Sequence, residues 1–304
     1  MGVRGRSVRG KVVLITGAAR GIGAAVAADL AAKGAKVALV GLEPEELDRV
    51  AAGCGPDASA WVADVTSWTD LEAAVAGVVE RYGGIDVVIA NAGIAAIGFT
   101  RSIDPKAFER VIEVDLLGVW RTVRVALPHL IERRGYAMLV SSLAAIVHIP
   151  GNAAYSAAKA GVEAFANSLR AEVRHLGVAV GVVHPTFIAT DMVNGTGEHP
   201  VFGPLRAASP GLAGKTYPLP VAVRLISAGV ARRSRAVHVP GWVGAVKLFR
   251  ALMPRVVERQ ARKIVPQADA AILADIAERG AVESSMVGPG ARAAAQSAET
   301  RTAE

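Results

Sequence analysis

Short runs of apolar, mostly β-branched residues alternate along the chain with longer Ala-rich stretches of helical spacing. Within each run, apolar residues occupy consecutive positions, which is typical of parallel strands buried on both faces of a sheet. Repetition of a strand followed by a helix predicts an α/β fold with a doubly wound parallel sheet flanked by helices. We expect about seven strands, near residues 11–17, 35–41, 59–65, 85–93, 136–142, 178–185 and 236–242.

Three segments depart from this alternation. Residues 192–220 are rich in Gly, Pro, Ser and Thr, and we expect a long loop with a little helix that serves as a lid or binding segment. Residues 243–280 predict an amphipathic helical extension that follows a single domain over residues 1–242. Residues 281–304 lack apolar periodicity, and we expect them to form a disordered tail.

The composition limits the classes of protein and of site. The chain has 304 residues, 52% of them hydrophobic, which is enough for a full core. Its one cysteine, Cys54, excludes an internal disulfide, and the six His residues lack metal-ligand spacing, so we expect no metal site. No apolar run reaches the roughly 20 residues that span a bilayer. No apolar segment of signal-peptide type follows the basic N-terminus, so a cytoplasmic location is expected.

The net charge of +7 is modest, but part of it is concentrated in one segment. Between Lys247 and Lys263, six basic residues accompany one acid, Glu258. Neither a known nucleic-acid module nor interleaved aromatic and basic residues accompany this charge. We therefore expect no nucleic-acid partner.

A Gly-rich turn joins the first expected strand to the first helix, in the sequence "LITGAARGIGAAVAADL". Gly17, Gly21 and Gly23 let the backbone approach a pyrophosphate, and the free N–H groups at the start of the helix attract an anion. Tight turns also use Gly for conformational reasons alone. The position directly after the first strand favours a dinucleotide site in a Rossmann-type sheet.

The spacing T-G-x-x-x-G-x-G in this turn resembles that of the short-chain dehydrogenase/reductase family. Further motifs at the family's intervals follow: "ANAG" after the fourth strand, "ADV" at Asp64, and Ser142 thirteen residues before Tyr155. The segment "HPTFIATDM" resembles the family's P-G-x-x-x-T, although Thr186 replaces the Gly. The resemblance covers about residues 10–192 and the strand near Val239.

The resemblance implies an NAD(P)-dependent oxidoreductase that interconverts a secondary alcohol and a ketone. Tyr155 is expected to exchange a proton with the substrate oxygen, and Ser142 to hold that oxygen. An unperturbed tyrosine has a pKa near 10, so a cation four residues along the helix, Lys159, would favour the phenolate. Lys159 would also hold the ribose of the nicotinamide.

The expected cofactor contacts come from every motif. They are Thr16, Gly17, Arg20, Gly21, Ile22, Gly23, Gly41, Leu42, Glu43, Asp64, Val65, Asn91, Ala92, Gly93, Tyr155, Lys159, Pro185, Ile188 and Thr190.

Asp115 departs from the family pattern, because the position forty residues before Tyr155 usually carries Asn. A carboxylate only accepts hydrogen bonds, whereas an amide also donates. If the backbone carbonyl at this position holds the water of the proton relay, Asp can substitute for Asn. A buried Asp115 can also be protonated, or it can strengthen the cationic state of Lys159. We expect Asp115 to support the relay.

The choice between NADP and NAD rests on the end of the second strand. Gly41 stands where NAD-preferring members carry an Asp, so a 2′-phosphate is tolerated there, and Arg20 can pair with it. Glu43 acts in the opposite direction, since it either bonds a free ribose or repels a phosphate. Alternatively, Glu43 is an ordinary acid beside Pro44 at a helix start. These residues favour NADP slightly.

The C-terminal extension contains apolar residues at intervals of three and four, with basic residues between them, and we expect a break or restart at Pro254. The apolar stripe either packs on the domain or a second subunit, roofs a substrate channel, or lies on an anionic membrane through residues 245–263.

The expected substrate is a hydrophobic alcohol or ketone, such as a steroid-like or lipid-like compound. The segments "IAAIGFT", "LAAIVHIPGN" and "FIATDMV" around the pocket are mostly apolar, and His148 either bonds a substrate or is an ordinary loop residue. The resemblance also implies a homo-oligomer, a dimer or tetramer, through the two long helices that would contain Leu117 and Phe165. The alternative function is a regulator or membrane-surface scaffold that binds a dinucleotide with weak catalysis.

Overall fold

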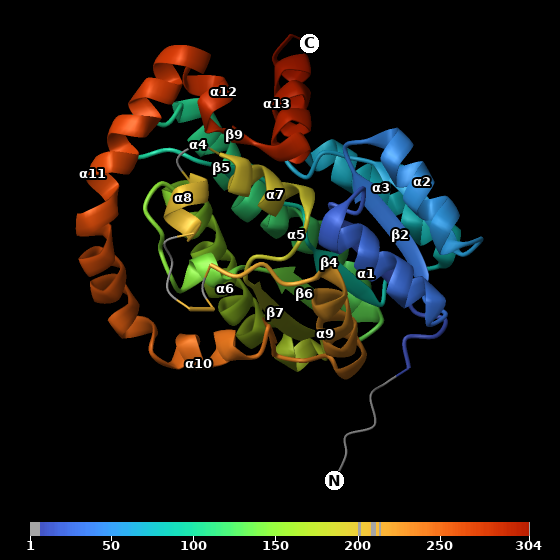
Figure 1. Ribbon diagram of the computed structural model, residues 1–304. Coiled ribbons are helices and arrows are strands. Elements are labelled where there is room, and N and C mark those ends of the chain that lie inside the picture. Colours follow the sequence, from blue (N-terminus) through green and yellow to red (C-terminus); the bar gives the residue numbers. More distant parts are fainter. Residues whose placement is uncertain (1–6, 200–201, 208–210, 213, 304) are drawn as a thin grey trace.

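A parallel sheet of seven strands forms the centre of the protein in the computed structural model, which describes residues 7–199, 202–207, 211–212 and 214–303 (Figure 1). The strand order is β3-β2-β1-β4-β6-β7-β8. The doubly wound α/β prediction is therefore confirmed, with all seven expected strands present. They are β1 (Val12–Thr16), β2 (Lys36–Gly41), β3 (Ala58–Val62), β4 (Val87–Ala90), β6 (Tyr136–Val140), β7 (Ala179–Pro185) and β8 (Ala236–Val239).

Helices cover both faces of this sheet and bury its side chains. One face packs against α1 (Gly21–Ala32), α2 (Pro44–Cys54) and α9 (Leu219–Arg232). The other packs against α3 (Trp68–Tyr82), α5 (Val119–Glu132) and α6 (Ala153–Val173). Burial on two faces explains the continuous apolar runs, since all five residues of β1 are buried.

The strand order reverses at β1, whose neighbours are β2 and β4. In open α/β sheets, the crevice at the carboxyl ends of the strands beside such a reversal is the usual place for a ligand. The Gly-rich turn follows β1, and the segments that follow β4, β6 and β7 reach the same edge. The topology therefore collects the predicted motifs at one place.

The connections contain several shorter elements. They are β5 (Ala95–Ala96), α4 (Pro105–Ile112), the π-helix η1 (Glu113–Gly118), the 3-10 helices η2 (Leu143–Ala145) and η3 (Arg174–Leu176), α7 (Asp191–Glu198) and α8 (Phe202–Ala207). The expected lid over residues 192–220 thus contains two helices. Residues 200–201, 208–210 and 213 of that segment lie outside the described residues.

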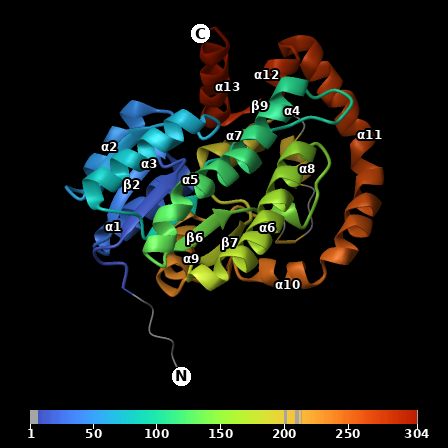
Figure 2. The same cartoon turned by 180° about the vertical axis from the view of Figure 1, so that it is seen from behind.

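The C-terminal extension runs around the outside of the domain (Figures 1 and 2). It consists of α10 (Trp242–Leu248), the 3-10 helix η4 (Arg250–Leu252) and α11 (Met253–Arg279). Pro254 lies in the first turn of α11, as expected for a helix that restarts there. Buried Glu163 of α6 anchors the extension, because its Oε1 lies 2.6 Å from Lys247 Nζ and 3.2 Å from Arg250 Nη1.

The prediction of a disordered tail from residue 281 is wrong. The segment forms α12 (Ala281–Ser285), β9 (Met286–Val287) and α13 (Gly288–Ala303). Strand β9 pairs antiparallel with β5, with Ala95 opposite Val287 and Ala96 opposite Met286. Backbone pairing and close packing of small residues hold this segment, and neither produces the apolar periodicity that the prediction required.

None of the described helices combines the length and the apolar character that crossing a membrane requires. Among the described residues, no group of three or more His, Cys, Asp or Glu side chains is placed to hold a metal ion.

Candidate dinucleotide and active site

The Gly-rich turn between β1 and α1 has a conformation that only glycine tolerates well. Gly17 and Gly21 have φ angles of +65° and +56°. A Cβ on Gly17 would lie 2.7 Å from the Cα of Ala92, and one on Gly23 would lie 2.3 Å from the carbonyl oxygen of Gly17. The turn is therefore packed tightly against Ala92 on one side, and Gly17 and Gly21 line a cavity on the other.

Asn91 after β4 fastens this turn. Its side-chain Nδ2 donates to the carbonyl oxygens of Thr16 and Gly17 at 3.0 and 3.1 Å. The Thr16 hydroxyl accepts in return from the backbone N–H groups of Asn91 and Ala92. These reciprocal bonds join the ends of β1 and β4 at the strand-order reversal, and they leave the upper side of the turn accessible.

The predicted catalytic residues meet where β6 ends and α6 begins. Lys159 Nζ lies 5.4 Å from the centre of the Tyr155 ring, as expected for side chains one helical turn apart. Ser142 follows β6 and lines the same cavity as Tyr155, and its hydroxyl accepts from the backbone N–H of Ala144 at 3.1 Å. The neighbouring Ser141 donates to the Lys159 carbonyl oxygen at 2.8 Å and so fixes α6 against β6.

Asp115 lies behind this group on the π-helix η1, and it is completely buried. Its Oδ2 is 3.1 Å from Lys159 Nζ, and its Oδ1 accepts from the backbone N–H of Ile94 at 2.7 Å. Gly93 makes room for this ion pair, because a Cβ there would lie 3.0 Å from Asp115 Oδ2. Burial raises the pKa of Asp115, whereas the neighbouring Lys159 ammonium and the Ile94 N–H lower it.

The electrostatic environment opposes ionisation of Tyr155. Burial raises the pKa of the Tyr155 phenol, Lys159 lowers it, and the Asp115 carboxylate raises it again. Burial alone would lower the pKa of Lys159, but Asp115 and Tyr155 outweigh this effect and raise it. The site therefore favours a protonated lysine beside a neutral phenol, which is the form of Tyr155 that carries a proton to donate.

Arg20 does not point freely into the site. Its guanidinium forms a two-pronged ion pair with Glu43, in which Nε donates to Oε2 at 3.0 Å, and its Nη1 lies 3.2 Å from Asp191 Oδ2. Both carboxylates raise the pKa of Arg20, with the Glu43 hydrogen bond as the largest cause. Two anions thus surround the cation that was expected to bind a 2′-phosphate.

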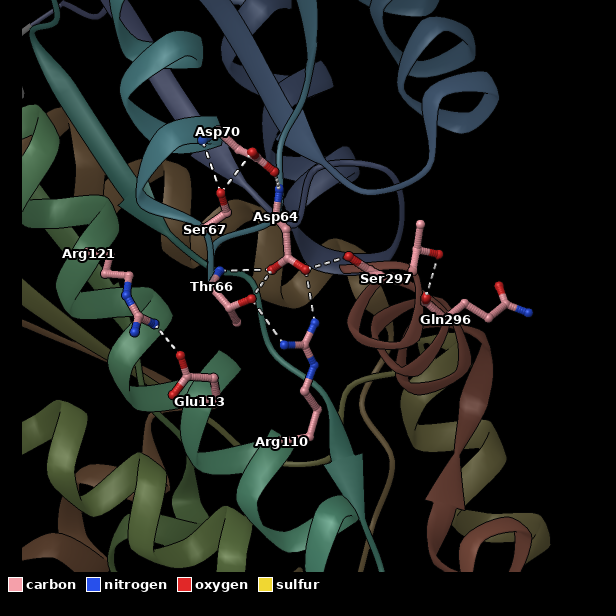
Figure 3. Close-up of polar contacts among 10 residues, drawn as sticks. Asp64, Thr66, Ser67, Asp70, Arg110, Glu113, Arg121, Gln296 and Ser297 are labelled. Carbon is pink, nitrogen blue, oxygen red and sulfur yellow. Dashed lines mark hydrogen bonds and ion pairs between the residues drawn. The ribbon is translucent and has the colours of Figure 1, made fainter. Parts of the chain in front are cut away.

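Asp64 is also fully engaged by protein groups (Figure 3). Its Oδ1 accepts from the N–H and hydroxyl of Thr66 at 2.8 and 2.7 Å. Its Oδ2 accepts from Arg110 at 2.9 Å and from the hydroxyl of Ser297 at 2.7 Å. Burial opposes the charge, but these bonds prevail and hold the Asp64 pKa far below its ordinary value.

Most predicted site residues line one cavity. They are Gly17, Arg20, Gly21, Ile22, Gly41, Leu42, Glu43, Asp64, Val65, Asn91, Ala92, Gly93, Ser142, Tyr155, Lys159, Pro185, Ile188 and Thr190. Thr16, Gly23 and Asp115 do not line it, because they support the turn and the lysine from behind. Thr190 caps α7 and packs close to Gly21, which brings the start of α7 to the turn.

Sequence reasoning missed one whole wall of this cavity. Val287, Gly288, Pro289, Gly290, Ala291, Ala293 and Ala294 also line it. Small residues carry no apolar stripe, so periodicity gave no signal. The G-P-G sequence at residues 288–290 is a turn signal that only the three-dimensional contact makes meaningful.

A second cavity opens beside Ser142 and Tyr155. At about 240 Å³ it is as large as the first, at about 210 Å³. The three apolar segments expected around the pocket contribute Ile97, Leu143 and Phe187, among others, whereas exposed His148 does not line it. Helix α11 closes it with Met253, Val256, Val257, Gln260, Ala261, Ile264 and Val265.

Comparison with known proteins identifies the family of this chain. A family model described as "short chain dehydrogenase" matches residues 11–200. The chain belongs to the short chain dehydrogenase family. The predicted resemblance is therefore confirmed, and the protein is an NAD(P)-dependent oxidoreductase.

Two of the relatives are named as dehydrogenases. (-)-Trans-carveol dehydrogenase of Rhodococcus erythropolis is 38% identical over 215 residues, which are 65% of this chain and 78% of that protein. Trans-4-hydroxycyclohexanecarboxylate dehydrogenase of Sinomonas cyclohexanicum is 37% identical over 194 residues, which are 61% of this chain and 75% of that protein.

A solved short chain dehydrogenase structure agrees with the fold. The 3-ketoacyl-(acyl-carrier-protein) reductase of Brucella melitensis, solved in complex with NADH, has a TM-score of 0.69 and 27% identity. The match covers 77% of this chain and 98% of that one. This likeness supports a nicotinamide dinucleotide as the cofactor.

Proposed function

We propose that the protein interconverts a secondary alcohol and a ketone on a hydrophobic, cyclic or lipid-like skeleton. The observation that carries this proposal is the second cavity, which is largely apolar and meets the dinucleotide cavity at Ser142 and Tyr155. Two of the family relatives are named as dehydrogenases of cyclic alcohols, which supports the same substrate class.

The residues fit a dinucleotide. Gly17 and Gly21 give the turn its left-handed backbone, and the open turn at the start of α1 suits the pyrophosphate. When bound, the nicotinamide supplies or accepts the hydride. Lys159 would hold its ribose, with Asp115 keeping that ammonium charged and in place.

Proton exchange belongs to Tyr155 in this proposal. During reduction its phenol donates a proton to the substrate oxygen, and during oxidation its phenolate takes one up. Ser142 donates a hydrogen bond to the same oxygen, which orients it toward Tyr155. Lys159 stabilises the phenolate left behind, at the distance of one helical turn.

A substrate panel tests this assignment. We expect turnover of cyclic and lipid-like ketones or alcohols, followed by nicotinamide absorbance, and loss of about 10² or more in kcat for Tyr155→Phe. Turnover limited to sugars or small charged substrates would contradict the hydrophobic class. Dinucleotide binding with no turnover of the panel would favour the regulator or scaffold instead.

For the cofactor, we now propose a preference for NAD over NADP, against the slight preference of the sequence motifs. The ion pairs of Arg20 with Glu43 and Asp191 support this proposal. A 2′-phosphate in this place would meet two carboxylates and would have to displace one of them. Comparing kcat/KM with NADH and NADPH tests the preference, and higher efficiency with NADPH would overturn it.

We further propose that residues 245–263 contact an anionic membrane surface. Leu248, Phe249 and Leu252 are 82%, 59% and 53% exposed, and Arg255 and Arg259 nearby are also exposed. A hydrophobic substrate would then reach the cavity roofed by the same helix directly from the lipid.

Vesicle flotation tests the membrane contact. The intact protein should float with vesicles that contain phosphatidylserine, and the double variant Leu248→Ser, Phe249→Ser should float much less. Leu273→Ser is the matched control, because Leu273 is a 42% exposed apolar residue of α11 outside the segment. Absence of flotation by the intact protein would remove the proposal.

The oligomeric state is a proposal as well. Trp120 of α5 is 40% exposed and packs edge-on against Trp68 at 5.1 Å between ring centres, an apolar surface that favours a partner copy. We expect light scattering to give a dimer or tetramer. A monomer at micromolar concentration would contradict this expectation.

A further inference from the structure

We propose that residues 286–297, here called the C-terminal strap, form part of the dinucleotide site and close over its adenosine half. This inference rests on the dinucleotide site of the proposed function. The family match ends at residue 200, so the strap lies outside the part of the chain that the family shares.

The strap faces the same cavity as the Gly-rich turn. Its residues 287–291, 293 and 294 line that cavity together with Leu42 and Val65, which follow β2 and β3. Ala291 and Ala294 are 5% and 1% exposed, and they pack against Val65 in one apolar cluster. Since these side chains are small, the strap lies close to the sheet edge and still leaves space for a flat aromatic ring such as adenine, whose faces suit apolar walls.

Polar contacts anchor the strap before it reaches the cavity. The backbone N–H of Ile97 donates to the Ser285 carbonyl oxygen at 2.9 Å, next to the β5–β9 pair. His199 Nε2 lies 2.9 Å from the Ser284 carbonyl oxygen, and His199 Nδ1 accepts from the Phe202 N–H. The strap is thus joined on one side to the segment after Gly93 and on the other to the lid.

Ser297 fastens the far end of the strap. Its hydroxyl donates to Asp64 Oδ2 at 2.7 Å, on a carboxylate that Arg110 and Thr66 hold from the other side (Figure 3). Hydrogen bonds to a charged acceptor are among the stronger ones. Ser297 is therefore a positioning residue, which acts on the cofactor through the strap and Asp64.

Because the strap is held at both ends, it should affect the rate at which the cofactor is released. A dinucleotide that lies between the sheet edge and the strap leaves only when the Ser297–Asp64 end opens. The strap should therefore slow NADH release and strengthen binding, and the adenosine half should account for the gain.

The experiment uses the full chain and NADH, with fluorescence titration for affinity and stopped-flow displacement for release. Ser297→Ala should speed NADH release about tenfold, the loss expected for one hydrogen bond to a charged group. Ser297→Thr should restore slow release because it keeps the hydroxyl. Ala294→Leu should weaken NADH binding about tenfold by filling the cavity, whereas Ala295→Leu, one residue along and not lining the cavity, should stay within about twofold.

Binding of the two halves of the cofactor shows which half the strap contacts. The Ala294→Leu variant should weaken ADP-ribose as much as NADH and leave nicotinamide mononucleotide unchanged. Wild-type affinity and release in both Ser297→Ala and Ala294→Leu would overturn the strap and leave the proposed function intact, and so would tighter binding by Ser297→Ala. Failure of the unaltered protein to bind any dinucleotide would overturn the proposed function and the strap together.

Discussion

The carboxylate of Asp115 lies 3.1 Å from the ammonium nitrogen of Lys159. At most 3% of either side chain is exposed to solvent. An Asn at this position could still accept a hydrogen bond from Lys159, but it would carry no negative charge. Asp instead neutralises much of the field that Lys159 exerts on Tyr155. The pair thus sets how readily Tyr155 loses its proton.

Replacing Asp115 by Asn should move the pH profile to lower pH. The carboxylate raises the Tyr155 pKa, so its removal lowers that pKa, while Tyr155 continues to raise the pKa of Lys159 and favours its charged form. Alcohol oxidation requires the phenolate, so its acidic limb should begin at lower pH. Profiles of kcat/KM in both directions check this, and superimposable limbs for the two proteins would refute it.

Removing the charge of Glu43 should increase the use of NADPH. In Glu43→Gln, Arg20 loses its two-pronged partner and becomes able to bind a 2′-phosphate. We expect the ratio of kcat/KM for NADPH over NADH to rise about tenfold, which corresponds to about 1.4 kcal/mol. Glu45→Gln removes the same charge from an exposed position on the same helix and should leave the ratio unchanged.

A large side chain on the roof of the second cavity should select against large substrates. Ile264 of α11 lines that cavity, and Ile264→Trp would fill part of it. We expect KM for a bulky cyclic ketone to rise about tenfold or more, with little change for a small ketone. Gln267→Trp, on the exposed side of α11, serves as control. Equal effects of Ile264→Trp on both ketones would show that the substrate binds elsewhere.

The Gly-rich turn should not accept a Cβ. Gly17→Ala combines a left-handed backbone with a contact of 2.7 Å to Ala92, and we expect a loss of about 1–3 kcal/mol in the free energy of unfolding. Gly53→Ala on α2 meets no atom within 4 Å, so it should be neutral or gain up to about 1 kcal/mol. Thermal unfolding of both variants measures the contrast, and equal melting temperatures would contradict it.

Acid should weaken the anchor of the C-terminal extension. Burial opposes the charge of Glu163, but His184 and Lys247 lower its pKa to about 2. A carboxylate with a depressed pKa stabilises the fold above its unfolded value and loses this contribution as the pH falls through its folded value. Melting temperature should therefore fall between about pH 4.5 and pH 2. Glu163→Gln should flatten this slope, and parallel curves would exclude Glu163 as its source.

The local pattern of apolar residues was sufficient to predict the strands of the sheet. All seven strands lie where consecutive apolar residues occur, because a strand that is buried on both faces consists mostly of apolar residues. The Gly-rich turn was predictable for a similar reason, since its backbone angles and close contacts leave room for no other residue. The motif spacing likewise placed Tyr155 and Lys159 on one helical face, which needs only helix geometry.

Contacts between segments that are distant in the chain could not be predicted from the sequence. Arg20 and Glu43 come from different helix starts, and nothing in either motif indicates that they pair. Two of the six basic residues between Lys247 and Lys263, Lys247 itself and Arg250, turn inward to Glu163, so the outward charge of this segment is smaller than the sequence implied. Ser297 reaches Asp64 across 233 positions of the chain, a contact that only the wrapping of α11 creates.

The path of α11 also has a consequence for biosynthesis. Translation completes β8 at Val239 well before it reaches the strap at residue 286. A nascent chain can therefore assemble its whole sheet and Gly-rich turn while the nucleotide cavity still lacks one wall. Tight retention of the cofactor would then begin only after the ribosome has released enough chain to encircle the domain.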